Sequence, residues 1–161
     1  VMDRFTTFMH PEADPLGSGW QINQSLIAVG SGGLFGRGYG QSIQKFNYLP
    51  EATSDAIFAV YAEELGFIGC VILLGLYALF VSRGYRVATH AQDLFGSLLV
   101  VGIVTAIIFQ TFLNIAGMLA VAPLSGLPLP FMSHGGTALL ATLASIGIIL
   151  NVSKYQRKII R

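Results

Sequence analysis

Charged side chains are scarce in this sequence. They make up 11% of the 161 residues, whereas apolar residues make up 53%. A soluble domain carries about 25% charged residues, so this chain has too little polar surface for a water-soluble protein. From Leu94 to Ser153 no Asp, Glu, Lys or Arg occurs. A membrane-spanning helix needs roughly 20 apolar residues, so two crossings fit in this interval. The sequence therefore predicts an integral membrane protein.

Cysteine and net charge are also low. Cys70 is the single cysteine, and the formal net charge is +1. One cysteine excludes an intramolecular disulfide and a cysteine metal cluster. A charge so close to zero leaves no basic patch of the kind that binds nucleic acid.

Three hydrophobic segments predict three transmembrane helices, over about residues 56–81, 94–118 and 135–152. The first follows Pro50 and a cap-like Thr-Ser-Asp sequence that ends at Asp55, and prolines separate the second segment from the third. The fold class that we expect is an all-α polytopic membrane bundle fragment with about three transmembrane helices and a large extracytoplasmic loop.

Lysine and arginine predict the orientation of these helices. Arg83 and Arg86 precede the second segment, and four more basic residues follow the third. An even number of crossings separates these two sites, so both belong on one side, which the positive-inside rule identifies as the cytoplasm. We therefore expect residues 1–55 to form an extracytoplasmic loop. Residues 56–161 should form the transmembrane region, with a cytoplasmic C-terminal tail.

The N-terminal third has features of its own. Trp20 to Val29 has the spacing of a short amphipathic helix, too short to cross the membrane, so we expect an interfacial or re-entrant segment. The glycine-rich run "GSGGLFGRGYG" that follows either lets backbone approach a ligand or forms turns. It is not a dinucleotide-binding fingerprint, because no strand precedes it.

Asp55 lies at the predicted start of the first span. The free N–H groups and the dipole of a helix favour a negative charge there, so one interpretation is a helix cap. The other is a carboxylate at a hydrated rim, which acts as a general base towards a hydroxyl group. Its position alone does not decide between the two.

Glu63 and Glu64 lie further into the predicted span, roughly 12 to 14 Å along the helix axis from Asp55. Ionisable groups at such depth are costly unless they are paired or face water. One or both are protonated or bonded to a neighbouring segment, or they line a polar recess that opens outward with Asp55 near its rim.

Arg4, Arg37 and Lys45 are the cations of the predicted outer segment. A cation beside flexible backbone suits the phosphate of a lipid-linked substrate. Alternatively, these residues contact anionic lipid headgroups or pair with acids of the same segment.

Two stretches carry signatures in a fixed order: "GSGWQINQSLIAVGSGGLFGRGYGQSIQKFNYLPEATSDAIFAVYAEELGFIG" and "PLSGLPLPFMSHGGTALLATLASIGIILNVS". Both resemble the SEDS family, the FtsW, RodA and SpoVE proteins of cell division, elongation and sporulation. The words "QKFNYLPE" are most similar to the division-type FtsW branch. The family has about ten spans, so this chain resembles its C-terminal portion.

The resemblance implies a peptidoglycan glycosyltransferase that polymerises lipid II into β-1,4 glycan strands outside the bacterial cytoplasmic membrane, at the division septum if the FtsW branch holds. It implies a class B penicillin-binding protein (a transpeptidase) and other division or elongation proteins as partners. No cofactor is certain, although Mg²⁺ or Mn²⁺ is one source of charge for a leaving pyrophosphate. Asp55 matches the family's essential carboxylate and is expected to be the general base. The candidate substrate-binding residues are Arg4, Arg37, Lys45, Glu63, Glu64 and Ser133.

Two other classes of function fit the same residues. Acids and broken helices within a membrane also suit a lipid II flippase. A non-catalytic scaffold that recruits the division transpeptidase is the other alternative.

Overall fold

The structure, a computed structural model, describes residues 18–42 and 55–155. These residues form four helices and no strand, which confirms the all-α class. The helices are α2 (Ser18–Gly32), α4 (Ile57–Thr89), α5 (Leu94–Met118) and α6 (Gly136–Lys154). In the described part of the chain, α4, α5 and α6 are long and apolar enough to cross a membrane.

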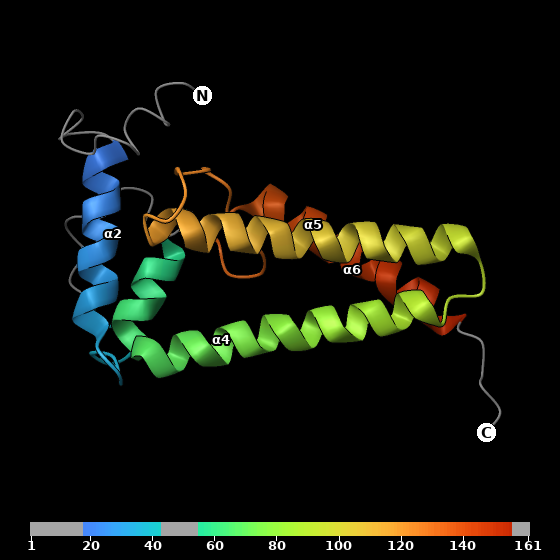
Figure 1. The fold of residues 1–161 in the computed structure, drawn as a ribbon, viewed down its shortest axis with the longest axis horizontal. Coiled ribbons are helices and arrows are strands. Elements are labelled where there is room, and N and C mark those ends of the chain that lie inside the picture. Colours follow the sequence, from blue (N-terminus) through green and yellow to red (C-terminus); the bar gives the residue numbers. More distant parts are fainter. Residues whose placement is uncertain (1–17, 43–54, 156–161) are drawn as a thin grey trace.

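Helices α4 and α5 form a long antiparallel hairpin, and α6 runs back along them (Figure 1). Asp93 caps α5, since its side-chain oxygen accepts a hydrogen bond from the Gly96 N–H at 2.8 Å. This bond satisfies one of the free donors at the helix start and fixes where α5 begins. Only 6% of the most apolar window of α6 is buried within the chain, so its side chains are left to face lipid or other protein.

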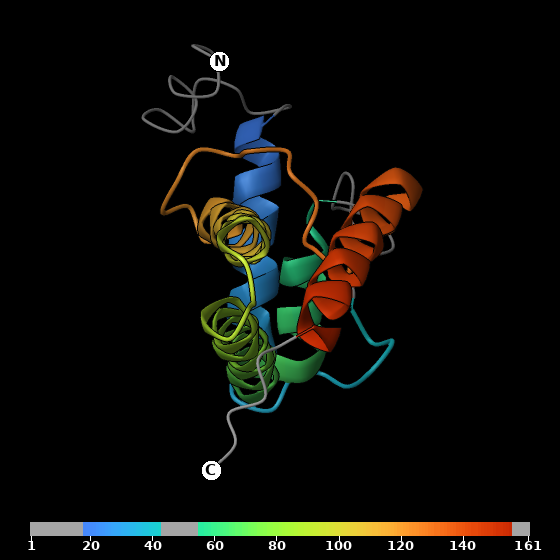
Figure 2. The ribbon, with the colours of Figure 1, turned by 90° about the vertical axis from the view of Figure 1, so that its right-hand side faces the viewer.

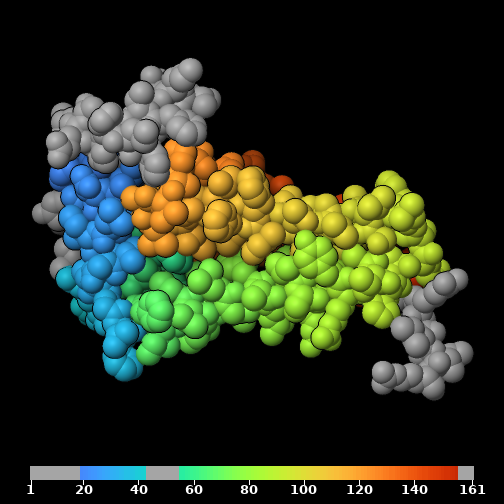
Figure 3. Space-filling view, in the orientation of Figure 1, coloured from blue at the N-terminus to red at the C-terminus, as the bar shows by residue number. Residues whose placement is uncertain are grey.

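Helix α2 lies across one end of this hairpin and does not run along it (Figures 1 and 2). Ile22, Ser25 and Ala28 form its buried face, towards the bundle. Figure 3 shows α2 covering the end of the longer helices. The short helix expected over Trp20 to Val29 is therefore present and extends to Gly32.

Helix α4 is not straight, which the sequence did not predict. Gly66 has φ 67° and ψ −166°, far from helical values, and the segment Ile57–Leu65 turns away from the long axis at this residue (Figure 1). Gly66 has no Cβ, so it adopts this left-handed φ without steric cost. The part of α4 that runs along the bundle therefore starts after Gly66 and continues to Thr89, past the expected end at Val81.

The loop between α5 and α6 is held by side chains that bind its carbonyl oxygens. Asn114 donates to Leu127 at 2.7 Å, Gln110 donates to Pro128 at 2.7 Å, and Tyr77 donates to Pro130 at 2.5 Å. We call this run, Leu127 to Pro130, the anchored loop. The bond to Pro130 satisfies a buried backbone acceptor, and the bonds to Leu127 and Pro128 are partly buried.

Removing one of these bonds should lower stability by a measurable amount. Tyr77→Phe leaves the Pro130 carbonyl without its hydroxyl donor, and we expect a loss of about 1 kcal/mol in thermal unfolding of the protein in detergent. Tyr85→Phe is the matched control, because the Tyr85 hydroxyl bonds Thr105 at an exposed position. Equal effects of the two changes would contradict the importance of the Pro130 bond.

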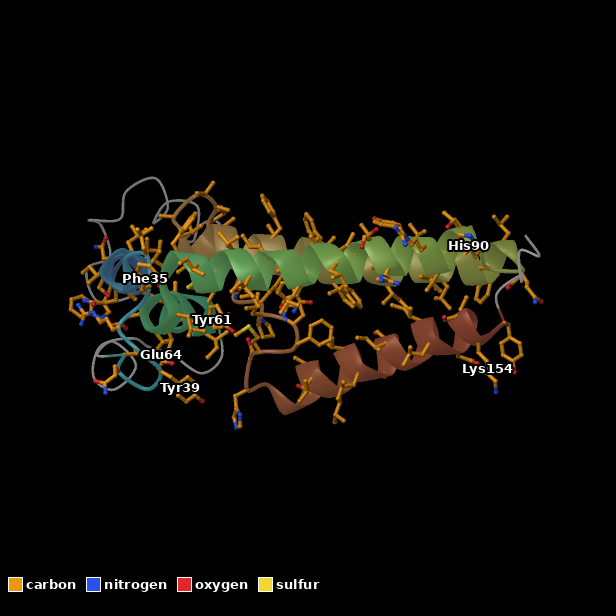
Figure 4. All side chains as sticks on the ribbon, turned by 90° about the horizontal axis from the view of Figure 1, so that it is seen from below. Phe35, Tyr39, Tyr61, Glu64, His90 and Lys154 are labelled. Atoms are coloured by element: carbon orange, nitrogen blue, oxygen red, sulfur yellow. The ribbon has the colours of Figure 1, made fainter. Side chains whose placement is uncertain are left out.

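The basic residues beside the long helices share one end of the bundle. The connection from α4 to α5 and the end of α6 lie together, as His90 and Lys154 show at the right of Figure 4. Arg83 and Arg86 lie in the last turns of α4, towards the same end. The anchored loop and α2 are at the opposite end (Figure 1).

Candidate functional site

Asp55 lies where three elements meet, at the end of the bundle that α2 covers. Its main-chain oxygen accepts a hydrogen bond of 2.8 Å from the side chain of Asn114 in α5. The same Asn114 amide holds Leu127 of the anchored loop. Asp55 itself is half-buried, so within the described residues it is not sealed in the core.

The structure bears on the helix-cap interpretation of Asp55. Helix α4 begins at Ile57, and the residue at its N-cap position is Ala56, whose side chain has no polar atom. Asp55 stands one residue outside that position. Asp93 at the start of α5, by contrast, occupies the N-cap position and bonds the helix. The N-cap position of α4 is therefore Ala56 and not Asp55, and no side chain caps the helix there.

Glu63 is enclosed by the glycine-rich loop that follows α2. It is 1% exposed, and its carboxylate accepts a 2.5 Å hydrogen bond from the Ser42 hydroxyl. An Arg37 guanidinium nitrogen lies 3.8 Å from the other carboxylate oxygen, with Arg37 40% exposed. A buried carboxylate requires such partners. Glu63 is thus bonded to a neighbouring segment, one of the alternatives that the sequence left open.

The main chain of the same loop closes around the kink of α4. In a straight helix the N–H groups of residues 67 and 68 would bond the carbonyls of residues 63 and 64. Here the Phe67 N–H bonds Gly33 O at 2.9 Å and the Ile68 N–H bonds Leu34 O at 3.2 Å. The Arg37 and Gly38 N–H groups bond the carbonyls of Glu63 and Glu64, each at 3.0 Å. All four backbone groups freed by the kink thus have partners.

We call this set of four bonds the kink clasp. The sequence left two interpretations of the glycine-rich run, a close approach of its backbone to a ligand or simple turns. In the structure the backbone does make a close approach, and the segment that it approaches is α4. A Cβ on Gly36 would overlap the carbonyl oxygen of Glu64, and Gly36 has φ 79°. Glycine is therefore required at this position by both contact and conformation.

Glu64 differs from Glu63 in its surroundings. It is 8% exposed, and its buried Oε1 atom has no hydrogen-bond partner among residues 18–42 and 55–155. Figure 4 shows its side chain near Tyr39 of the glycine-rich loop, on the side away from α5. A buried carboxyl oxygen without a donor is costly.

The kink also changes the expected depth of both glutamates. Because Ile57–Leu65 turns away at Gly66, Glu63 and Glu64 lie beside the glycine-rich loop at one end of the bundle and not two turns inside a straight span (Figure 1). The helical spacing from Asp55 to the two glutamates is unaffected, because the kink comes after Glu64.

The remaining candidate residues separate into two groups. Ser133 is 8% exposed, and its hydroxyl accepts a 2.7 Å bond from the Leu129 N–H, so it closes the turn at the end of the anchored loop. Arg4 and Lys45 lie outside the described residues. Of the three expected cations, Arg37 is the one that the structure describes.

Sequence reasoning overlooked the polar side chains of α5. Asn114, 2% exposed, touches both Asp55 and the anchored loop, and Gln110 holds the next carbonyl of that loop. Both residues interrupt a stretch that is otherwise apolar. A polar residue inside a predicted span is a signal of function or of internal bonding, and it was available in the sequence.

An apolar cavity of about 280 Å³ lies at the same end of the bundle. Phe58, one turn after Asp55, lines it together with Val29 of α2 and Phe67 beyond the kink. A second cavity of about 380 Å³ continues along α4 and α5 and shares Leu74 with the first. Both surfaces suit a hydrocarbon chain more than a polar ligand.

The described residues do not fit a metal site made by protein side chains alone. Across 18–42 and 55–155, no three His, Cys, Asp or Glu side chains gather closely enough to hold an ion.

Comparisons with known proteins agree with this arrangement. The family model described as "Cell cycle protein", for FtsW, RodA and SpoVE, matches residues 1–158. Stage V sporulation protein E of Bacillus subtilis is 51% identical, over 96% of this chain and 42% of that protein. Probable peptidoglycan glycosyltransferase FtsW of Trichlorobacter lovleyi is 46% identical, over 94% of this chain and 40% of that protein. The chain thus spans about two fifths of these relatives.

Solved structures show the same helix arrangement. A chain from a peptidoglycan synthase complex, described for its structural coordination of polymerization and crosslinking, matches with a TM-score of 0.74. It is 31% identical, over 97% of this chain and 42% of that chain. A mutant of Rod shape determining protein RodA of Thermus thermophilus matches with a TM-score of 0.63 at 36% identity, over 83% of this chain and 40% of that chain.

Proposed function

The chain belongs to the FtsW, RodA and SpoVE family of cell cycle proteins, and we propose that the whole protein is a peptidoglycan glycosyltransferase that polymerises lipid II into β-1,4 glycan strands. One observation carries the proposal. Asp55 is half-buried at one end of a membrane bundle, its main chain is bonded to α5, and it lies three residues before Phe58, which lines an apolar cavity. That combination suits a sugar reaction on a lipid-linked substrate.

Asp55 acts as the general base in this proposal. Its carboxylate removes the proton from the 4-hydroxyl of the acceptor sugar. The hydroxyl oxygen forms a bond to the anomeric carbon of the donor as the bond to the pyrophosphate oxygen breaks, and the electron pair leaves with undecaprenyl pyrophosphate. An α-linked donor gives a β-linked product by inversion, so one displacement with one base is sufficient.

Arg37 is our candidate to stabilise the leaving pyrophosphate. Its guanidinium is 40% exposed while Glu63 lies on one side of it, so its remaining N–H groups are accessible to an anion. Arginine binds phosphate oxygens with a planar fork of donors. We assign Glu63 and Ser42 the role of holding this loop and not of contacting the sugar, because their polar atoms already bond each other. Arg4 and Lys45 remain proposed contributors of positive charge.

Two further parts of the substrate have proposed positions. The apolar cavity beside Phe58 accommodates part of the polyprenyl chain. Glu64 remains a proposed contact for a hydroxyl or amide group of the disaccharide peptide, but its Oε1 atom is buried, so this contact requires the side chain to move outward. Ser133 is a weaker candidate for substrate contact, since its hydroxyl is already engaged with the Leu129 N–H.

Location and partners follow the same proposal. The protein is a membrane protein, and we place the Asp55 end outside the cytoplasm, because the opposite end carries Arg83, Arg86 and Lys154. We place it at the division septum, with a class B penicillin-binding protein as the transpeptidase partner, alongside other division or elongation proteins. The similarity to a peptidoglycan synthase complex supports a partner of this kind.

Purified full-length protein supplied with lipid II in detergent tests the proposal. We expect strands many disaccharides long, separated by gel electrophoresis and sensitive to a muramidase. Detergent removes the two membrane sides, so a protein that only flips lipid II, or only recruits partners, yields no polymer. Absence of polymer with the protein folded, in the presence of its transpeptidase partner, would overturn the proposal.

A further inference from the structure

Asn114 joins the main chain of Asp55 to a loop far away in the sequence. Its side-chain nitrogen lies 2.8 Å from the Asp55 carbonyl oxygen and 2.7 Å from the Leu127 carbonyl oxygen. Both partners are acceptors only, so the atom that faces them must be the NH₂ group, which has two hydrogens. Each hydrogen is used once, and the orientation of the amide is fixed by chemistry.

The Asn114 side chain is buried, whereas its two partners are not. Asn114 is 2% exposed, while Leu127 is 39% exposed and Asp55 is half-buried, so both bonds are partly buried. Loss of the amide removes a donor from each of the two carbonyl oxygens, and a lost hydrogen bond of this kind is costly where water does not replace it. Position 114 therefore fixes the backbone at Asp55 relative to α5.

The Oδ1 atom of the same side chain is buried and has no hydrogen-bond partner in the part of the chain that the structure describes. A leucine of similar size would avoid this cost but would leave both carbonyls unsatisfied. Unsatisfied buried atoms are tolerated where another requirement outweighs them. Here that requirement is the double donor that places Asp55.

We infer that Asn114 is a positioning residue for the reaction: through the main chain of Asp55 it sets where the Asp55 carboxylate stands. This inference rests on the proposed function. A carbonyl oxygen held on one side fixes the Cα of Asp55, and with it the origin of the side chain. A general base must lie within hydrogen-bond reach of the proton that it removes, and a displacement of about 1 Å can cost about 100-fold in rate.

Gln110 offers a matched control within one turn of α5. It is half-buried and donates to Pro128 of the anchored loop, and among the described residues it does not bond Asp55. If Asn114 matters only because it holds the loop, then Gln110→Ala should have the same effect on the rate. If Asn114 matters because it places Asp55, the two substitutions should differ.

The test compares Asn114→Ala, Asn114→Ser and Gln110→Ala in the full-length protein with purified lipid II. The polymerisation rates are expressed per folded molecule. The folded fraction of each variant is measured by gel filtration and thermal unfolding. We expect kcat to fall by about 10- to 100-fold for Asn114→Ala with KM little changed. Asn114→Ser keeps one hydroxyl donor and should be intermediate, and Gln110→Ala should retain most of the rate despite a lower Tm.

The inference is overturned if Asn114→Ala keeps a rate within a factor of about two per folded molecule, or if Gln110→Ala loses as much. It is also overturned if Asn114→Ser does not fold while Gln110→Ala does, since stability then explains the residue. If the unsubstituted protein makes no polymer, the proposed function is overturned together with this inference. If it makes polymer and the variants give one of the contrary results above, only the inference about Asn114 is overturned.

Discussion

Asp55→Asn is expected to reduce glycan polymerisation by the full-length protein by about 10²- to 10⁴-fold, the usual contribution of a general base. The amide has nearly the same size as the carboxylate, and the bond between Asn114 and the Asp55 carbonyl involves only the main chain. The backbone geometry should therefore persist while the proton acceptor is lost. The measurement is the initial rate with purified lipid II, with kcat and KM determined separately.

Asp93→Asn is the control for this experiment. Asp93 also precedes a long helix, but it lies in the connection at the other end of the bundle, and asparagine is an equally good N-cap. The Asp93→Asn protein should polymerise lipid II at the same rate as the unsubstituted protein. If Asp55→Asn polymerised as fast as Asp93→Asn, the general-base assignment would be wrong, even if the protein is a polymerase.

The sequence predicted the two spans that are bounded by strong local signals. The expected 94–118 coincides with α5, because Asp93 gives a cap and a long uncharged run follows it. The expected 135–152 differs from α6 by one residue at its start and two at its end. The first span was predicted too short: its expected end at residue 81 lies before Arg83 and Arg86, whereas α4 continues to Thr89. A helix can continue past the apolar region, and basic residues near its C-terminus are favourable.

The kink was not predictable in the same way. Gly66 is one of several glycines in the apolar segments, and nothing beside it in sequence distinguishes it. What makes the kink tolerable is the kink clasp, formed by Gly33, Leu34, Arg37 and Gly38 about thirty residues earlier. Backbone bonds of this kind have no hydrophobic period, so neither helical spacing nor composition reports them.

The candidate site was predicted unevenly for a related reason. Asp55 was identified by resemblance, and Glu63 and Arg37 were identified as ionisable residues in unusual places; the structure brings those two within 3.8 Å of each other. Asn114 was overlooked because it is uncharged and lies almost sixty residues from its partner. Long-range pairing by a neutral amide leaves a trace in the sequence only as a polar residue in an apolar run.

Gly36→Ala is expected to destabilise the protein by about 3 kcal/mol, because two costs combine at this residue. Alanine at φ 79° costs about 1 kcal/mol or more, and its Cβ would overlap the Glu64 carbonyl oxygen within the kink clasp. The overlap can be relieved only by moving the loop off α4. That movement breaks backbone bonds at a membrane helix, where unsatisfied groups cost several kcal/mol. Thermal unfolding in detergent measures the loss.

Gly40→Ala separates the two costs. Gly40 has φ 76°, almost the same as Gly36, but a Cβ there would have no atom within 4 Å. It should therefore lose only the conformational part, about 1 kcal/mol. The difference between the two variants measures the close contact between the loop and α4. Because Arg37 and Ser42 lie in this loop and bind Glu63, Gly36→Ala should also lower the polymerisation rate per folded molecule, and Gly40→Ala should not. Equal losses of stability in the two variants would show that the loop does not depend on its contact with the kink.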